Sequence, residues 1–176
     1  MILGHEFYNL PATEAAPLLC GKLIFHKTDG GEVLSGRITE VECYFGEEDS
    51  ACHAHRGKTK RNAVLYHEGG VAYVYLCYGI HELLNIVTGE ENHPEAVLIR
   101  GIEGASGPGL TTKALRVTRA ENGISLITSG ILWIEDDGYK PDIEYLPRVG
   151  IDYADKSDRE RLWRMRSHAH KYAPHK

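Results

Sequence analysis

The stretch that decides the fold is Ile38-Thr-Glu-Val-Glu-Cys-Tyr-Phe-Gly-Glu-Glu-Asp-Ser-Ala-Cys-His53. Its first half alternates in the manner of a β-strand, and its second half is an acidic loop of small residues. Successive side chains of a strand point to opposite faces. One face is therefore expected to carry Ile38, Glu40, Glu42 and Tyr44, and the other Thr39, Val41, Cys43 and Phe45. Two carboxylates and an aromatic ring on one face indicate a functional surface rather than packing.

The segments on both sides of this stretch predict the remaining elements. Asp29-Gly30-Gly31 is a turn signal, so residues 21–27 and 32–45 are expected to form a β-hairpin. A long polar loop follows at residues 46–62, and loops of that length in a compact domain are usually functional. Helices are expected at residues 11–21 and 110–117, strands at 71–77, 80–88 and 96–102, and short strand-like pieces at 124–127, 131–134 and 148–151.

The length of 176 residues is that of one domain with a sizeable core. We expect a single domain over residues 1–176, of the α+β class, built on a curved, largely antiparallel β-sheet with flanking helices. The segment from about residue 157 onward is expected to form either a final helix, over residues 157–166, or a flexible tail.

Charge and hydropathy limit the classes of partner. The net charge of −5 argues mildly against a nucleic-acid partner, but base clusters at residues 55–61 and 159–176 could contact phosphates. No apolar run approaches the roughly 18 residues of a membrane helix, so no membrane is expected. Residues 1–6 show no secretion signal, and the four cysteines form no Cys-x-x-Cys pair. A cytoplasmic protein with free thiols, close to the nucleoid if bacterial, is expected.

Glu40 and Glu42 are the first candidates for chemistry. A strand glutamate usually lies on a solvated face. Two like charges side by side, however, tend to raise one of the two pKa values. Such pairs occur where a general base or an electrostatic stabiliser is needed.

Two further clusters leave alternatives open. Tyr73-Val-Tyr-Leu-Cys-Tyr78 places tyrosines on one face of a strand, which indicates either ordinary β-packing or a stacking surface for a flat ligand such as a nucleobase. Cys52-His-Ala-His55 offers a thiol and two imidazoles to a metal ion, but the hard carboxylates beside them make a metal site the less favoured interpretation.

Read in order, the motifs resemble one family. They are Glu-x-Glu-x-Tyr-x-Gly-x-x-Asp-x-Ala-x-His, Gly-Lys-Thr-x-Arg-Asn, Tyr-Val-Tyr-x-x-Tyr-Gly, an Asn, Ala-Val-Leu-Ile-Arg, Gly-Pro-Gly and Arg-Val-Gly-Ile. This order is similar to that of the alkyladenine (3-methyladenine) DNA glycosylase family and covers most of the chain, from Pro11 to about Ala154. The resemblance implies a monofunctional glycosylase of base excision repair. It would flip alkylated or deaminated purines (3-methyladenine, 7-methylguanine, hypoxanthine, ethenoadenine) out of double-stranded DNA and hydrolyse the N-glycosidic bond.

The resemblance also implies roles for matching residues. Glu42 would be the catalytic base that activates water. The base pocket would be formed by Tyr44 and His53 on one face of the purine and Tyr75 on the other, with Asn85 crowding the 2-amino group of normal guanine and Leu98 and Val149 in the lining. Tyr78 would wedge into the DNA helix, Arg100 would hold a phosphate, and the basic loop would add the DNA contacts Arg56, Lys58 and Arg61.

This implied mechanism has a physical basis. A glycosidic bond inside a duplex is out of reach, so the nucleotide must be extruded. An alkylated purine is cationic and therefore attracts aromatic faces. It is also a good leaving group, so a base without a metal or cofactor suffices, and a monomer suffices. No lysine stands convincingly beside Glu42 to form a Schiff base, so strand cleavage is not expected.

The chain departs from the family pattern at three places. Leu110 follows Gly107-Pro108-Gly109 where the family tends to carry a lysine, and Met165-Arg166 follows Trp163-Arg164 where it commonly has Phe-Tyr. Cys43 and Cys52 replace small residues. Two other hypotheses stand beside the glycosylase: a catalytically silent binder of damaged nucleic acid, and a metal hydrolase that uses Cys52, His53 and His55.

Overall fold

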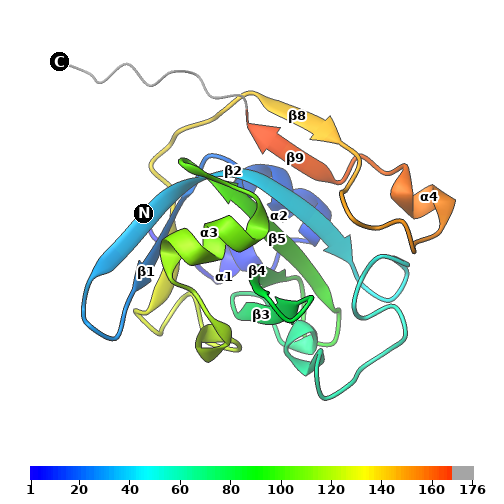
Figure 1. Ribbon diagram of the computed structural model, residues 1–176, viewed down its shortest axis with the longest axis horizontal. Helices are drawn as coiled ribbons and strands as arrows, with labels where there is room; N and C mark the ends of the chain where they lie inside the picture. Colours follow the sequence, from blue (N-terminus) through cyan, green and yellow to red (C-terminus); the bar gives the residue numbers. More distant parts are fainter. Residues whose placement is uncertain (168–176) are drawn as a thin grey trace.

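The computed structural model describes residues 1–167 (Figure 1). Its elements are, in chain order, α1 (His5–Tyr8), α2 (Ala12–Leu19), β1 (Leu23–Lys27), β2 (Val33–Phe45), η1 (Ala63–Tyr66), β3 (Ala72–Cys77), β4 (His81–Thr88), β5 (Glu95–Ile102), β6 (Ala105–Ser106), α3 (Pro108–Leu115), η2 (Arg119–Glu121), β7 (Leu132–Glu135), β8 (Ile143–Leu146), α4 (Lys156–Arg159) and β9 (Arg164–Ser167). This is the expected α+β domain with a curled antiparallel sheet, so the prediction of fold class is confirmed.

The strands form one nine-stranded sheet in the order β3-β4-β5-β2-β1-β7, with β6 beside β5 and the β8–β9 hairpin attached to β2. All of these pairs are antiparallel. The predicted β1–β2 hairpin and the predicted strands β3, β4 and β5 are confirmed. In Figure 1 the sheet curls around α3, and α1 and α2 lie behind it.

Strand β2 is the centre of the sheet because it changes neighbours along its length. Its first half pairs with β1, its second half pairs with β9 on one side, and β5 follows it on the other side from Ile38 to Phe45. A β-bulge at Thr39 lies where the neighbours change. Ile38 and Glu40, two residues apart on β2, pair there with Ile102 and Gly101, which are adjacent on β5. The bulge moves Ile38 into the core with Val41 and Cys43, so the expectation that Ile38 shares a face with Glu42 is wrong.

The helices cover the core formed by the sheet. Helix α2 buries Ala12, Ala15, Ala16 and Leu19 against β2 and β5, and α3 packs Leu115 into the same hydrophobic cluster. Both helices fall where the sequence predicts them. Helix α3 ends at Leu115 and is capped by Arg116, which adopts the left-handed conformation with φ of 54°. Within residues 1–167, no helix is long and apolar enough to span a membrane.

Three local expectations are wrong. Residues 124–127 and 148–151 run as irregular segments rather than strands, although Ser125 makes an isolated bridge to Val71. Residues 157–167 form neither one long helix nor a free tail: the single-turn helix α4 ends at Arg159, and β9 follows along the edge of β2. The hairpin of β8 and β9 was not anticipated, because each strand has only four residues and β9 has a single apolar one. Residues 168–176 lie outside the described part of the chain.

Candidate active site

One row of side chains crosses the sheet and sets the geometry of the site. Tyr73 of β3 is paired with Asn85 of β4, Asn85 with Leu98 of β5, and Leu98 with Glu42 of β2. Directly opposed residues of antiparallel strands point to the same face, with Cβ atoms about 5 Å apart. Residues that are distant in the sequence therefore meet in one row because of strand register alone.

Glu42 is completely buried, yet its carboxylate is well supplied with hydrogen bonds. Its Oε1 accepts a hydrogen bond from the backbone N–H of Val149 at 2.8 Å, and its Oε2 accepts one from the Tyr44 hydroxyl at 2.9 Å. The Arg100 guanidinium lies 3.6 Å from Oε1 and also pairs with Glu40 at 3.2 Å. A buried carboxylate with this many donors is oriented rather than merely tolerated.

Burial raises the pKa of Glu42, although Arg100, the Val149 amide, the Tyr44 hydroxyl and Arg148 all act in the opposite direction. The sequence suggested that repulsion from Glu40 would raise this pKa. That explanation is wrong, because Arg100 stands between the two carboxylates and Arg164 lies 3.1 Å from Glu40. A raised pKa makes Glu42 a stronger base than an ordinary glutamate while it is ionised.

An aromatic pocket lies beside this carboxylate. It contains about 350 Å³ of empty space, a volume that includes its opening to solvent. Tyr44, which bonds to Glu42, forms part of its wall and so links the acid to the cavity. The lining residues are Tyr44, Ala51, Cys52, His53, Leu65, Tyr73, Tyr75, Asn85, Ala96 and Tyr153.

Three rings of the pocket lining contact one another. The ring of His53 packs edge-on to Tyr75 at 4.5 Å between centroids, and the rings of Tyr73 and Tyr75 are 5.4 Å apart. The His53 Nδ1 also lies 3.1 Å from the Tyr73 hydroxyl. Burial, with the nearby charge of Arg61, lowers the pKa of His53 and so favours the neutral imidazole. Neutral aromatic surfaces of this kind suit a flat, cationic ligand.

Of the other three residues expected in the base pocket, Asn85 lines it, whereas Leu98 and Val149 are not among the lining residues. Asn85 is buried and donates a hydrogen bond to the Tyr73 carbonyl at 3.2 Å. Leu98 lies between Asn85 and Glu42 in the row described above and is almost fully buried. Val149 contributes its backbone N–H to Glu42, whereas its side chain is half exposed.

Tyr78 stands at the tip of the β3–β4 hairpin. It is 90% exposed and adopts φ of 50°, next to Gly79 with φ of 68°. A left-handed conformation at a non-glycine residue is strained, and such strain is found preferentially at functional sites. An exposed ring at the tip of a hairpin has the shape expected of a wedge.

The predicted basic contacts fall into two groups. Arg56, Lys58 and Arg61 are exposed on the loop that follows β2, with Lys58 placed 5.3 Å from the centre of the Tyr66 ring. Arg100 is different, because its guanidinium is engaged by Glu40 and Glu42 inside the site.

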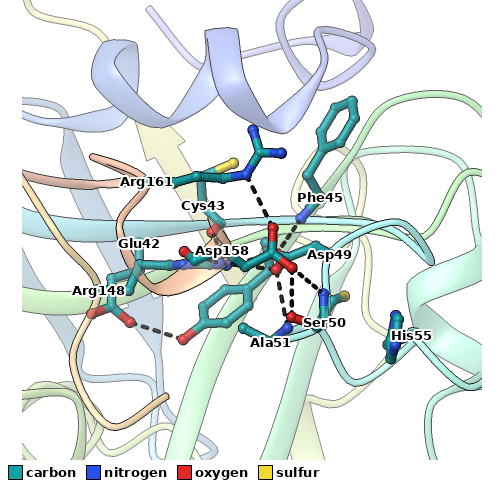
Figure 2. Close-up of polar contacts among 12 residues, drawn as sticks. Glu42, Cys43, Phe45, Asp49, Ser50, Ala51, His55, Arg148, Asp158 and Arg161 are labelled. Atoms are coloured by element: carbon teal, nitrogen blue, oxygen red, sulfur yellow. Dashed lines mark hydrogen bonds and ion pairs between the residues drawn. The ribbon is translucent and has the colours of Figure 1, made fainter. Parts of the chain in front are cut away.

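Sequence reasoning missed a buried ion pair behind the pocket. Arg148 donates two hydrogen bonds to Asp49, at 2.6 and 2.9 Å, and Figure 2 shows the polar contacts in which these two residues take part. Tyr153 was missed as well. Its hydroxyl donates to the Ala51 carbonyl at 2.8 Å, and its ring lines the pocket. The motifs Asp-x-Ala-x-His and Arg-Val-Gly-Ile contain two of these residues, but nothing in them indicates a contact.

The metal interpretation gains no support from the geometry of residues 1–167. That part of the chain holds no group of three or more His, Cys, Asp or Glu side chains able to bind a metal ion. The Nδ1 of His55 bonds to the Glu47 carbonyl at 2.7 Å, and the buried Cys52 thiol faces the Pro94 carbonyl.

The site thus combines a buried carboxylate, an aromatic pocket that could bind a flat ligand, and an exposed ring on a hairpin tip. A comparison with known families identifies the class of protein. The sequence matches the family model described as methylpurine-DNA glycosylase (MPG) over residues 6–171. The chain belongs to this family of DNA glycosylases, which are hydrolases with DNA as substrate.

Curated relatives agree with the family match. The chain is 42% identical to a protein from Methanocella arvoryzae, over 93% of this chain and 91% of the relative. It is 42% identical to a protein from Psychrobacter cryohalolentis (87% and 86%) and 38% identical to one from Borreliella burgdorferi (93% and 94%). All three relatives are named, provisionally, as 3-methyladenine DNA glycosylases.

Proposed function

We propose that the chain is a monofunctional glycosylase that removes alkylated or deaminated purines from double-stranded DNA through water activated by Glu42. The observation that carries the proposal is the hydrogen bond between the buried Glu42 carboxylate and Tyr44, which is itself a wall of the aromatic pocket. The acid and the cavity for the base thus share one residue.

The proposed reaction begins with extrusion of the damaged nucleotide. A damaged base loses less stacking and pairing energy on extrusion, which favours lesions over normal purines. Tyr78 would enter the DNA helix from the hairpin tip and fill the gap, while the exposed cations Arg56, Lys58 and Arg61 would contact phosphates. Stacking on an aromatic side chain is worth about 1–3 kcal/mol per base, which would offset much of the cost of extruding the purine.

Glu42 would then act on the sugar. Each of its oxygens accepts one hydrogen bond in the structure and retains a lone pair for a water molecule. The carboxylate would take a proton from that water as the oxygen bonds to the anomeric carbon, and the purine would leave with the electrons of the N-glycosidic bond. Negative charge at Glu42 also stabilises the positive charge that develops on the sugar.

The test is a single-turnover assay with defined lesions in a short duplex. We expect the purified protein to leave alkali-labile abasic sites opposite the intact strand at one or more of 3-methyladenine, 7-methylguanine, hypoxanthine and ethenoadenine, and none at undamaged purines. Activity should persist in chelator, because the proposed chemistry uses no metal. Binding of lesion duplex without any abasic site would identify a silent binder, and activity lost with a stoichiometric metal would identify a metal hydrolase.

A further inference from the structure

The feature that carries a further inference is the ion pair between Arg148 and Asp49. Both side chains are essentially excluded from solvent. Arg148 donates to both Asp49 oxygens and to the Cys43 carbonyl at 3.0 Å. Its Nε is buried and has no hydrogen-bond partner within residues 1–167. Buried pairs of this kind are weak sources of stability, since apolar residues often replace them without loss.

The Arg148 side of the pair reaches the proposed catalytic base. The next residue, Val149, supplies the backbone N–H that binds Glu42 Oε1 at 2.8 Å. The Arg148 guanidinium carbon also lies 4.9 Å from the centre of the Tyr44 ring, and Tyr44 is the second donor to Glu42. One buried cation therefore fixes both groups that hydrogen-bond to the carboxylate.

The Asp49 side of the pair reaches the pocket wall. Asp49 accepts hydrogen bonds from the backbone N–H of Phe45, at the end of β2, and from that of Ala51, each at 3.1 Å. These bonds shape the turn that leads to Cys52 and His53 in the pocket lining. Figure 2 shows both bonds converging on Asp49, beside a second contact in which the Ser50 N–H donates to Asp158 at 3.0 Å.

We infer that Arg148 and Asp49 are positioning residues: their ion pair docks the segment after β8 onto the turn after β2, and thereby holds Glu42 and the rings in register. The inference rests on the proposed role of Glu42. Displacement of reacting groups by about 1 Å can slow a reaction about 100-fold. The pair thus acts on the rate of chemistry more than on affinity for DNA.

The experiment removes both charges at once. D49N/R148Q leaves no buried charge without a partner, and R148K keeps the cation but loses the planar two-pronged contact. K22Q/D136N is the matched control, because it neutralises the 2.8 Å pair of Lys22 and Asp136 at the β1–β7 end of the sheet. Each variant is compared with wild type for single-turnover release of a purine lesion, affinity for the lesion duplex, the pH dependence of the rate and thermal unfolding.

We expect D49N/R148Q to release the lesion about 10- to 100-fold more slowly than wild type, with nearly unchanged DNA affinity. R148K should recover part of that loss. The acid limb of the rate profile should move to higher pH, because Glu42 loses the fixed Val149 donor and the Arg148 charge, both of which lower its pKa. The charged and titratable groups around Glu42 in these measurements are Glu40, Tyr44, Tyr75, Arg100, Arg148, Tyr153 and Arg164.

Each outcome decides the inference. The inference is overturned if D49N/R148Q folds and keeps the rate and the acid limb of wild type. It is also overturned if D49N/R148Q loses as much DNA affinity as rate, or if K22Q/D136N slows lesion release as much as D49N/R148Q does. If the double variant does not fold, R148K decides by the same two readouts. Failure of the proposed function is distinguishable: E42Q measured in parallel would then keep the wild-type rate, whereas an inactive E42Q with an unaffected D49N/R148Q contradicts only the positioning role.

Discussion

Replacement of Glu42 by glutamine is expected to stabilise the folded protein at pH 8. Glu42 is a fully buried carboxylate whose pKa is raised by its burial, so its ionised form is unfavourable in the folded state. Glutamine keeps the shape and removes the charge. Neither neighbouring cation is left alone, because Arg100 still pairs with Glu40 and Arg148 still pairs with Asp49.

The size of the effect follows from these surroundings. Replacement of a whole buried ion pair by well-packed apolar residues is often stabilising by about 1–4 kcal/mol, and E42Q relieves the desolvation of one charge while both cations keep a partner. The two donors to Glu42 compensate part of its desolvation. We therefore expect a gain of about 1–3 kcal/mol in the free energy of unfolding. For a protein of this length, each kcal/mol raises Tm by roughly 2–4 °C.

The dependence on pH has a definite sign. A carboxyl whose folded-state pKa is raised binds more protons in the folded than in the unfolded state between the two pKa values, so its contribution to stability falls as pH rises through that window. The advantage of E42Q over wild type should therefore be small near pH 4.5, the ordinary glutamate pKa, and grow as the pH rises above it. Urea unfolding of both proteins across this range measures the difference, and titrations elsewhere in the protein cancel in it. Lower stability of E42Q at pH 8, or a difference that does not change with pH, would refute the reasoning.

Three further predictions concern the pocket, the hairpin tip and the core. Tyr78→Ala should lower excision from duplex DNA about tenfold and leave excision from a single strand nearly unchanged, with stability within about 0.5 kcal/mol of wild type by thermal unfolding, because the side chain is 90% exposed. Tyr75→Leu should weaken binding of a cationic alkylpurine about fivefold more than that of neutral hypoxanthine, as competition binding would show, since cation–π attraction is worth about 1 kcal/mol. Gly69→Ala should destabilise the fold by more than about 2 kcal/mol in urea unfolding, because its Cβ would meet the backbone oxygen of Tyr8, whereas Gly30→Ala, with only a distant neighbour, should change stability by less than about 0.5 kcal/mol.

Much of the sheet could be predicted because its strands carry their own signals. Alternation and turn residues locate the β1–β2 hairpin and the strands β3 to β5, where hydrophobic burial determines the register. Strand β9 was not predictable in the same way. Arg164–Ser167 is polar, and it is a strand because it pairs with Glu40–Glu42 across 124 residues of chain. The bulge at Thr39 also arises from a change of strand neighbours, which a local pattern does not reveal.

In the candidate site, too, contacts between residues close in the sequence were predictable, and contacts between distant residues were not. Glu42 and Tyr44 stand two residues apart on one strand, so the alternating pattern alone places them together. The Asp49–Arg148 pair joins residues 99 positions apart, and no spacing rule connects them. Repulsion between Glu40 and Glu42 was a wrong explanation for the same reason, since Arg100 comes from a different strand. The sequence therefore predicts which neighbouring side chains could act together, whereas the arginines that influence the pKa of Glu42 are brought to it only by the fold.

The most direct test of the account is single-turnover purine release by E42Q. Saturating enzyme is mixed with a lesion-bearing duplex, and abasic sites are counted after alkali treatment, with binding of the same duplex measured in parallel. The account predicts that E42Q binds the duplex much as wild type does and releases no base on the wild-type timescale. Release at the wild-type rate would show that another group activates the water and would contradict the assignment of Glu42.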